Sequence, residues 1–209
     1  MTKRLSAALT AGAMAVLAGL STSTAAHDDD DNISLVFTGV AVANTRAAPS
    51  LKAYTDWCNA ATGFCVPTVQ QPVYDTATGR KRGTVHVWGA FPFNTGTTYP
   101  GAICFSEFMV FDFGDGEVYT HTAPNATCGA FMDPALKPPK HTELGATAVV
   151  AGGGDGVISG GTGRYKHWTG TFTDRVFVGF GAPTSGVGGI IYYDQLIFLL
   201  FPKDDGRGH

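Results

Sequence analysis

From residue 33 onwards, short apolar segments are dominated by Gly, Thr, Val and aromatic residues while good helix formers are sparse, and this pattern predicts β-strands. Gly, Pro, Asn and Asp separate the segments, and no segment keeps apolar residues at helical spacing over a dozen positions. About eight strands in one domain indicate a small closed antiparallel β-barrel, an all-β fold without exposed strand edges. The proline-rich stretch 132–145 is predicted to be a surface loop in which His141 is solvated. Strands are predicted over 33–44, 66–75, 83–93, 102–113, 117–123, 145–153, 156–161, 167–180 and 190–201.

Several predicted strands are apolar on both faces. In 102–113, Met109 and Phe111 lie on one face while Phe108 and Val110 lie on the other, and the last predicted strand has the same property. An isolated barrel exposes its outer surface to water, so its strands should alternate cleanly. Two apolar faces therefore imply a filled or ligand-binding interior and a covered exterior. A partner subunit, the N-terminal strand or a loop can supply this cover, and we expect a homotrimer or homodimer.

The N-terminus has the pattern of a secretory signal peptide. Lys3 and Arg4 precede an apolar run over 5–20, and small residues follow as far as Ala26. This run is shorter than the ~20 residues that a membrane-spanning helix needs. We expect cleavage after Ala26, or one residue earlier. Loss of residues 1–26 removes two positive charges, so the formal net charge changes from −3 to −5.

The remaining chain is predicted to be a single exported domain. An acidic disordered leader is expected over 27–32, the barrel over 33–203 and a disordered tail over 204–209. The only basic cluster, 80–82, lies between two glycines and is typical of an exposed loop tip. We therefore expect no nucleic-acid partner and no membrane partner after signal cleavage, and we expect an extracellular or periplasmic location.

Four cysteines, an even number, favour disulfides in an exported chain. Cys58 and Cys65 flank a short turn-rich segment. Cys104 and Cys128 flank a hairpin; with Asp115 as its pivot, facing residue numbers add up to 230 and Cys128 lies one pleat from Cys104. The sequence contains no CxxC, HxH or HExxH spacing. We therefore predict the pairs Cys58–Cys65 and Cys104–Cys128 and no metal site.

The stretch GDGVISGGTGRYKHWTG, residues 154–170, is rich in glycine. A phosphate loop would need GxxxxGK[ST], and a dinucleotide site would need GxGxxG at the start of a helix; neither is present, so no nucleotide cofactor is expected. The calcium-binding nonapeptide alternative needs stacked repeats, whereas only one copy occurs. Gly160, Gly161 and Gly163 are instead predicted to relieve backbone crowding at a tight strand–turn–strand corner.

Residues 156–165 of this stretch resemble the Gly-Gly-Thr/Ser-Gly turn of the allene oxide cyclase and dirigent protein superfamily, and the order of strands is similar from about 83 to 201. The resemblance implies an eight-stranded barrel, commonly trimeric, with an apolar lumen. It also implies cyclisation, isomerisation or stereoselective coupling of a small apolar or phenolic molecule. The KHWTG step and the paired cysteines differ from the usual pattern and indicate a bacterial relative. The alternative is a non-catalytic extracellular ligand-binding or structural protein.

The predicted hairpin register places Glu107 near His121, on a face shared with Met109, Phe111 and Tyr119. Burial in an apolar wall would raise the pKa of Glu107 and suit it to acid–base catalysis, with His121 as its partner. The alternative is an ordinary surface pair, because periodicity does not tell which face is the lumen. Met109, Phe111 and Tyr119 are candidate substrate contacts.

Further candidates come from three other strands. Asp174 shares a face with several apolar residues and is a second candidate catalytic carboxylate. Trp88, Tyr192 and Asp194 are candidate substrate contacts, although carboxylates near strand ends are often structural. A GxSxG elbow is absent and the cysteines are committed to disulfides, so no serine or cysteine nucleophile and no cofactor are expected.

Overall fold

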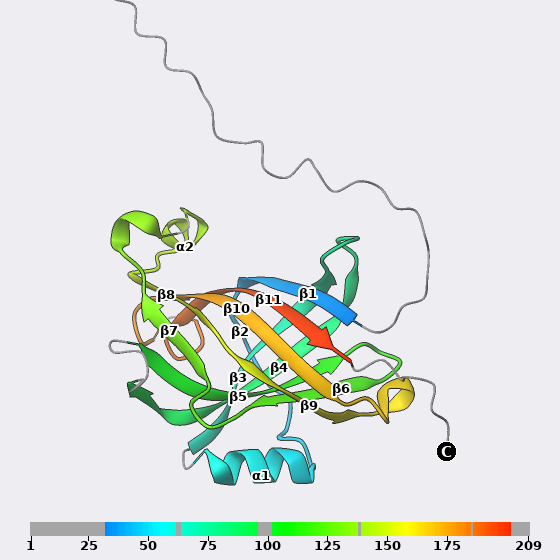
Figure 1. Ribbon diagram of the computed structural model, residues 1–209. Coiled ribbons are helices and arrows are strands. Elements are labelled where there is room, and N and C mark those ends of the chain that lie inside the picture. The colour runs from blue at the N-terminus through cyan, green and yellow to red at the C-terminus, as the bar shows by residue number, and fades with distance from the viewer. Residues whose placement is uncertain (1–31, 62–63, 96–101, 138, 185, 202–209) are drawn as a thin grey trace, which may run out of the picture.

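The computed structural model describes residues 32–61, 64–95, 102–137, 139–184 and 186–201 (Figure 1). The predicted signal peptide and C-terminal tail, and all but the last residue of the predicted leader, lie outside these residues. The predicted all-β barrel is confirmed. Its strands are β1 (Asn32–Val40), β2 (Val42–Ala43), β3 (Phe64–Asp75), β4 (Lys81–Thr95), β5 (Ile103–Asp112), β6 (Glu117–Thr122), β7 (Thr127–Phe131), β8 (Ala148–Gly153), β9 (Asp155–Gly161), β10 (Gly170–Phe180) and β11 (Ile190–Leu200). The helical segments are α1 (Lys52–Ala60), η1 (Pro134–Leu136), α2 (Pro139–Glu143) and η2 (Gly163–Tyr165).

Eight antiparallel strands form the closed ring, in the order β1-β3-β4-β5-β6-β9-β10-β11. Pairing of β11 with both β10 and β1 closes it. Strands β7 and β8 lie outside this ring and bridge β5 to β10 at one end of the barrel. The register of β10 is continuous across β8 and β9, since Val176 faces Gly152 and Thr173 faces Asp155. β8 and β9 are therefore one long strand interrupted at Gly154.

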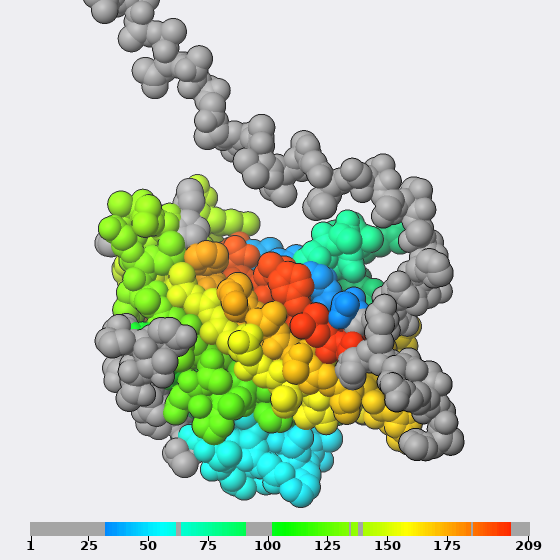
Figure 2. Space-filling model, viewed as in Figure 1, coloured from blue at the N-terminus to red at the C-terminus, as the bar shows by residue number. Residues whose placement is uncertain are grey.

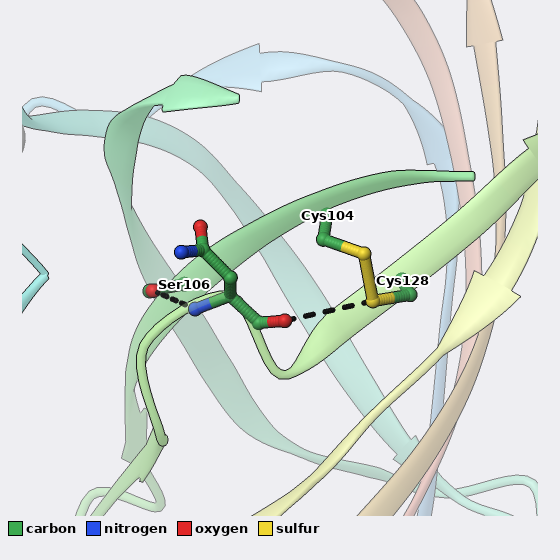
Figure 3. Close-up of a disulfide and its surroundings, with 4 residues drawn as sticks. Cys104, Ser106 and Cys128 are labelled. Carbon is green, nitrogen blue, oxygen red and sulfur yellow. Dashed lines mark hydrogen bonds between the residues drawn. A yellow bond between two sulfur atoms is a disulfide. The ribbon is translucent and has the colours of Figure 1, made fainter. Parts of the chain in front are cut away.

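The other interruption separates β6 from β7 at residues 123–126. Both strands pair with β5, but Met109 faces Thr120 in one ladder while Cys104 faces Cys128 in the other. The residue numbers of paired positions add up to 229 in the β5–β6 ladder and to 232 in the β5–β7 ladder. The difference means that three extra residues form a bulge between β6 and β7. Asn125 in this bulge has φ +55° and its N–H donates to Ser106 Oγ at 2.8 Å (Figure 3).

The hairpin register differs from the predicted one by a single residue. Asp112 faces Glu117, and the N–H of Phe113 donates to the carbonyl of Gly116 at 3.0 Å, so the turn has two central residues and not the single pivot Asp115. A slip of one residue turns every side chain to the opposite face of a strand. The predicted face shared by Glu107 and His121 is therefore wrong. Three extra residues at the bulge bring Cys128 opposite Cys104, and both predicted disulfides are present.

Helix α1 covers the outer face of β4 and β5 and lies below the barrel in Figure 1 and, in cyan, in Figure 2. Trp57 of α1 is buried against Phe108, with ring centroids 5.6 Å apart, and Trp88 belongs to the same cluster. The Cys58–Cys65 disulfide ties the end of α1 to β3. Sequence analysis predicted no helix here because nine residues are too few for a sustained apolar stripe. The outer face of β4 and β5 is therefore covered by a segment of the same chain, whereas we expected a partner subunit to cover the outside of the barrel.

The predicted surface loop 132–145 also contains helical turns, η1 and α2. His141 of α2 is 1% exposed, so the prediction that it is solvated is wrong. Its ring contacts the ring of Tyr192 at 4.6 Å between centroids, and a Cβ on Gly179 would lie 2.6 Å from its Nδ1. Gly179 and Tyr192 are ladder partners on β10 and β11. The absence of a side chain at Gly179 therefore makes room for the imidazole on the outer surface.

The glycine corner connects β9 to η2 at the end of the barrel opposite β7 and β8 (Figure 1). Gly160 and Gly163 have φ +131° and +56°, a region that other residues rarely adopt. A Cβ on Gly161 would lie 2.3 Å from the carbonyl oxygen of Glu117. The chain therefore turns tightly against β6, and this corner brings Tyr165 onto the end of the core.

Candidate functional site

A cavity of about 380 Å³ occupies the part of the barrel interior bordered by β7 and β8. Most of the side chains around it are apolar, and they come from β4, β5, β7, β8, β10 and β11. Among them are Ile103, Phe105, Val150, Val176, Val178 and Ile190. Cavities of this size accommodate small organic molecules.

The interior is hollow here because several inward positions carry no side chain. Gly89 of β4, Gly129 of β7 and Gly152 of β8 line the cavity. A Cβ on Gly129 would lie 2.6 Å from Val150 Cγ1, and one on Gly152 would lie 2.3 Å from the carbonyl oxygen of Cys128. These glycines let β7 and β8 approach closely while they leave space inside. The Cys104–Cys128 disulfide fastens β7 to β5 at the edge of the same wall (Figure 3).

Glu107 supplies the carboxyl group of the cavity wall. It is 2% exposed, its N–H donates to Thr122 Oγ1 at 2.9 Å, and its Oε2 accepts from Thr127 Oγ1 at 3.4 Å. Tyr193 on β11 is hydrogen-bonded to the same carboxyl group. Burial, with the charge of Asp174 adding to it, raises the pKa of Glu107 well above its usual value. Glu107 therefore holds a proton under conditions in which an exposed glutamate is ionised.

Asp174 lies next to this group on the inward face of β10 and is fully buried. Its Oδ1 accepts from the N–H of Gly154 at 2.6 Å, and its Oδ2 accepts from Gln195 Nε2 at 2.5 Å. Burial raises the pKa of Asp174 to about 6, although these two donors favour its charged form. The Oε1 atom of Gln195 is buried without a hydrogen-bond partner. Glu107 and Asp174 interact, so their protons are lost as those of a pair.

Both carboxyl groups lie close to the interruptions between β6 and β7 and between β8 and β9. Glu107 bonds through its backbone to Thr122, directly before the bulge, while Asp174 bonds to Gly154, the residue between β8 and β9. Tyr193 lines the cavity and stacks on Phe37 with ring centroids 5.8 Å apart. Burial and the two carboxyl groups raise the pKa of the Tyr193 hydroxyl, which therefore remains protonated. This arrangement places two interacting buried carboxyl groups with raised pKa values beside an apolar cavity.

Of the candidate residues named from sequence, the structure brings Glu107 and Asp174 together inside the barrel. Met109 and Phe111 also point inward and are fully buried, but they belong to the packed core and do not line the cavity.

The other candidates lie on the outer face. Tyr119 and Trp88 belong to the cluster beneath α1, and His121 stacks on Phe108 with ring centroids 6.0 Å apart. Tyr192 donates to or accepts from Thr38 Oγ1 at 2.7 Å, and Asp194 faces Thr38 across the β1–β11 ladder. The expected placement of these side chains in the lumen is therefore wrong. The hairpin slip accounts for His121 and Tyr119; at Trp88, Tyr192 and Asp194 the alternating pattern left the inward face undecided.

Sequence analysis missed Tyr193, Gln195 and Thr127. Tyr193 and Gln195 alternate with Tyr192 and Asp194 on β11, so the choice of the opposite phase would have found them. That phase carries Ile197 and Leu199, which are fully buried. Thr127 lies on β7, a strand that was not predicted because it is only five residues long.

Within the described residues, no cluster of three or more His, Cys, Asp or Glu side chains is arranged to hold a metal ion. Neither helix in this part of the chain is long and apolar enough to cross a membrane. No protein-family model matches the chain, and no curated protein matches it either. The assignment of function therefore depends on the geometry of the cavity.

Proposed function

We propose that this protein binds a small apolar or phenolic molecule inside the barrel and guides its isomerisation or cyclisation, with Glu107 as the proton donor and acceptor. The single observation that carries the proposal is a buried carboxyl group, Glu107, in the wall of a largely apolar cavity of about 380 Å³, where burial raises the pKa of this group. Such a group hydrogen-bonds a neutral oxygen of a ligand and transfers a proton to it. The walls hold the ligand in one conformation, and this restriction determines the stereochemical outcome.

The proposed reaction is neutral in protons and electrons. Glu107 gives its proton to an oxygen or an unsaturated carbon of the ligand, and the positive charge that develops draws electrons from a neighbouring double bond. A carbon–carbon bond closes or the double bond moves, and the carboxylate of Glu107 then takes a proton from the cationic intermediate, which gives the neutral product. Tyr193 keeps the carboxyl group in place through their hydrogen bond. The resemblance to the allene oxide cyclase and dirigent superfamily supports the same class of reaction.

Export is part of the proposal. Two disulfides are present, and disulfides persist in oxidising compartments. The N-terminal pattern of basic, apolar and small residues supports a cleaved signal peptide. The mature protein would meet its ligand outside the cytoplasm.

Binding is tested with N-phenyl-1-naphthylamine, a neutral apolar dye whose fluorescence rises in dry surroundings. We expect the parent protein to bind it and Val178→Trp, which fills the cavity, to bind at least tenfold more weakly. Phe177→Trp is the matched control, because Phe177 is the next residue of β10 and points outward. Equal binding by all three proteins would place the dye elsewhere and overturn the proposal. Should Val178→Trp fold poorly, Ala148→Leu fills the same cavity with a smaller change.

Turnover is tested by incubation of unsaturated ketones, epoxides and phenols with the protein in D₂O, followed by NMR and chiral chromatography. We expect deuterium in an isomerised or cyclised product and an excess of one enantiomer, both lost in Glu107→Gln. A Glu107→Gln variant that converts ligand as fast as the parent would remove Glu107 from the reaction. Tight binding without conversion of any of these compounds would favour the alternative, a non-catalytic extracellular ligand-binding protein.

A further inference from the structure

We infer that the cavity favours a ligand with a positive charge at its inner end, of which an apolar primary amine is the simplest example. The inference rests on the proposed function because the amine occupies the same cavity. It follows from the placement of two buried carboxyl groups, Glu107 in the cavity wall and Asp174 next to it, where the described lining residues include no cation.

The polar groups at the inner end of the cavity mostly accept hydrogen bonds. Glu107 lines the cavity and Asp174 lies beside it, and the unpartnered Oε1 of Gln195 lies in the same buried group. Among the residues that the structure describes, the lining contains no Lys, Arg or His. The hydroxyl donors are Thr127, which bonds Glu107, and Tyr193, which shares a hydrogen bond with the same carboxyl group. Asp174 accepts from the N–H of Gly154 and from Gln195, so the donors to the pair are all neutral. A buried carboxyl pair without a counter-charge attracts positive charge.

The nearest cation on the described strands does not enter the interior. Arg175 follows Asp174 on β10, is exposed, and donates through Nη1 to the Asp174 carbonyl and to Thr173 Oγ1. Its guanidinium therefore interacts with Asp174 from the outer side of the sheet. Asp155, also exposed, adds a negative charge on that side. The charges of Arg175 and Asp155 have opposite signs and act on Asp174 in opposite directions. The buried carboxyl pair therefore has no full counter-charge.

A ligand ammonium would supply the missing charge. Its approach lowers the pKa of Glu107, so that binding releases a proton from Glu107 and forms a charge-assisted hydrogen bond. The same electrostatic arrangement stabilises a cation that develops during proton-initiated isomerisation or cyclisation. An apolar amine then resembles the charged transition state, whereas a carboxylate of equal size is repelled. The charge preference of the cavity and the proposed reaction have a common physical origin.

The test uses three probes that carry different polar groups on the same phenylbutyl chain: 4-phenylbutylamine, 4-phenylbutan-1-ol and 5-phenylpentanoate. Their affinities are measured by displacement of N-phenyl-1-naphthylamine at pH 7.5. We expect the amine to bind at least tenfold more tightly than the alcohol, and the carboxylate to bind more weakly than both. In Glu107→Gln combined with Asp174→Asn the three affinities should come within about threefold of one another. Asp194→Asn, a control on the outer face of β11, should keep the full preference.

A second measurement needs no variant. Titration calorimetry of the parent with the amine, in two buffers of different ionisation enthalpy, should detect the release of a proton. The preference for the amine should decline as the pH falls through about 6, the pKa of Asp174, because the pair then becomes neutral. The groups that face the pair from neighbouring strands are Tyr193, Gln195 and Thr127, and they hold no charge over this range.

Equal affinity for the amine and the alcohol, or tighter binding of the carboxylate, would overturn this inference and leave the proposed function standing. Failure of all three probes and of the dye to bind would overturn the proposed function together with the inference. An amine preference that persists in the double variant would also overturn it, since the carboxyl pair would then not be its source.

Discussion

The two ends of the barrel interior are built from the same long strands but differ in what those strands carry inward. At the end with the glycine corner, Phe172 of β10 is 1% exposed and lies in a core with Phe111 and Tyr165. Four residues further along β10, Val176 lines the cavity instead. One end is filled by aromatic side chains, and the other is hollow and bordered by glycines.

In the proposed function, this contrast separates the part of the barrel that provides stability from the part that would bind the ligand. Large buried side chains at the filled end contribute most of the apolar surface removed from water. The hollow end depends on the short strands β7 and β8, on a bulge and on the Cys104–Cys128 disulfide. Glu107 and Asp174 lie at the boundary between the two ends. The N–H of Glu107 donates there to the side chain of Thr122, and the N–H of Gly154 donates to the side chain of Asp174. Bulges often adjoin functional sites for this reason.

The largest expected effect comes from the filled end. Phe172→Ala should lower the free energy of unfolding by about 3–5 kcal/mol, because it opens a new void in a close-packed core. Val176→Ala at the hollow end should cost only about 1 kcal/mol, since its methyl groups already face empty space. Urea denaturation of both variants measures the difference. Equal losses would show that the two ends are packed alike.

The next effect concerns the two disulfides. The chain-entropy relation assigns about 3.5 kcal/mol to the Cys104–Cys128 link, with 24 residues of separation, and about 2.5 kcal/mol to Cys58–Cys65, with 7. Cys104→Ser with Cys128→Ser should also weaken binding of N-phenyl-1-naphthylamine, because Cys128 lines the cavity. Cys58→Ser with Cys65→Ser should lower stability without this loss. The comparison would fail if both double variants affected dye binding equally.

The boundary between the ends should make stability depend on pH. Asp174 has a pKa raised to about 6 in the folded protein, so the folded state holds its proton more tightly than the unfolded state. The contribution to stability is therefore full below about pH 4 and is lost as the pH rises through 6. Asp174→Asn should remove a decline on the order of 2 kcal/mol between pH 4 and 7. Denaturation at a series of pH values measures it; identical slopes in both proteins would contradict the assignment.

The smallest effect is expected outside the barrel. Phe198 on β11 is 38% exposed, so Phe198→Ser should change the free energy of unfolding by no more than about 0.5 kcal/mol. The homo-oligomer expected from the two apolar faces stays a prediction, and sedimentation velocity tests it with the same variant. A monomeric variant of an oligomeric parent would place the subunit contact at this face of β11. A large loss of stability in a monomeric parent would mean that Phe198 is packed more tightly than its exposure indicates.

Sequence patterns predicted the positions of the strands better than the contacts that their residues make in the folded protein. The strand predicted over 190–201 is present as β11, and the two cysteine pairs form as expected. Helix α1 and strand β7 were missed because each is short and owes its stability to tertiary contacts, such as the packing of Trp57 on Phe108. Glu107 and Asp174 could be named as candidates from the sequence. Their partner Tyr193 could not, because β11 is apolar on both faces.

The sequence by itself determined most of the strands, the glycine corner and the expectation of two disulfides, since each depends on residues close together in the chain or on an even number of cysteines. Only the tertiary structure decided which face of each strand points inward. A single residue of register at the hairpin moved His121 outside, and a bulge of three residues brought Cys128 opposite Cys104. The period of a strand is two, so a local pattern is the same for either face. Closure of the barrel and the packing of α1 against β5 determine which of the two faces points inward.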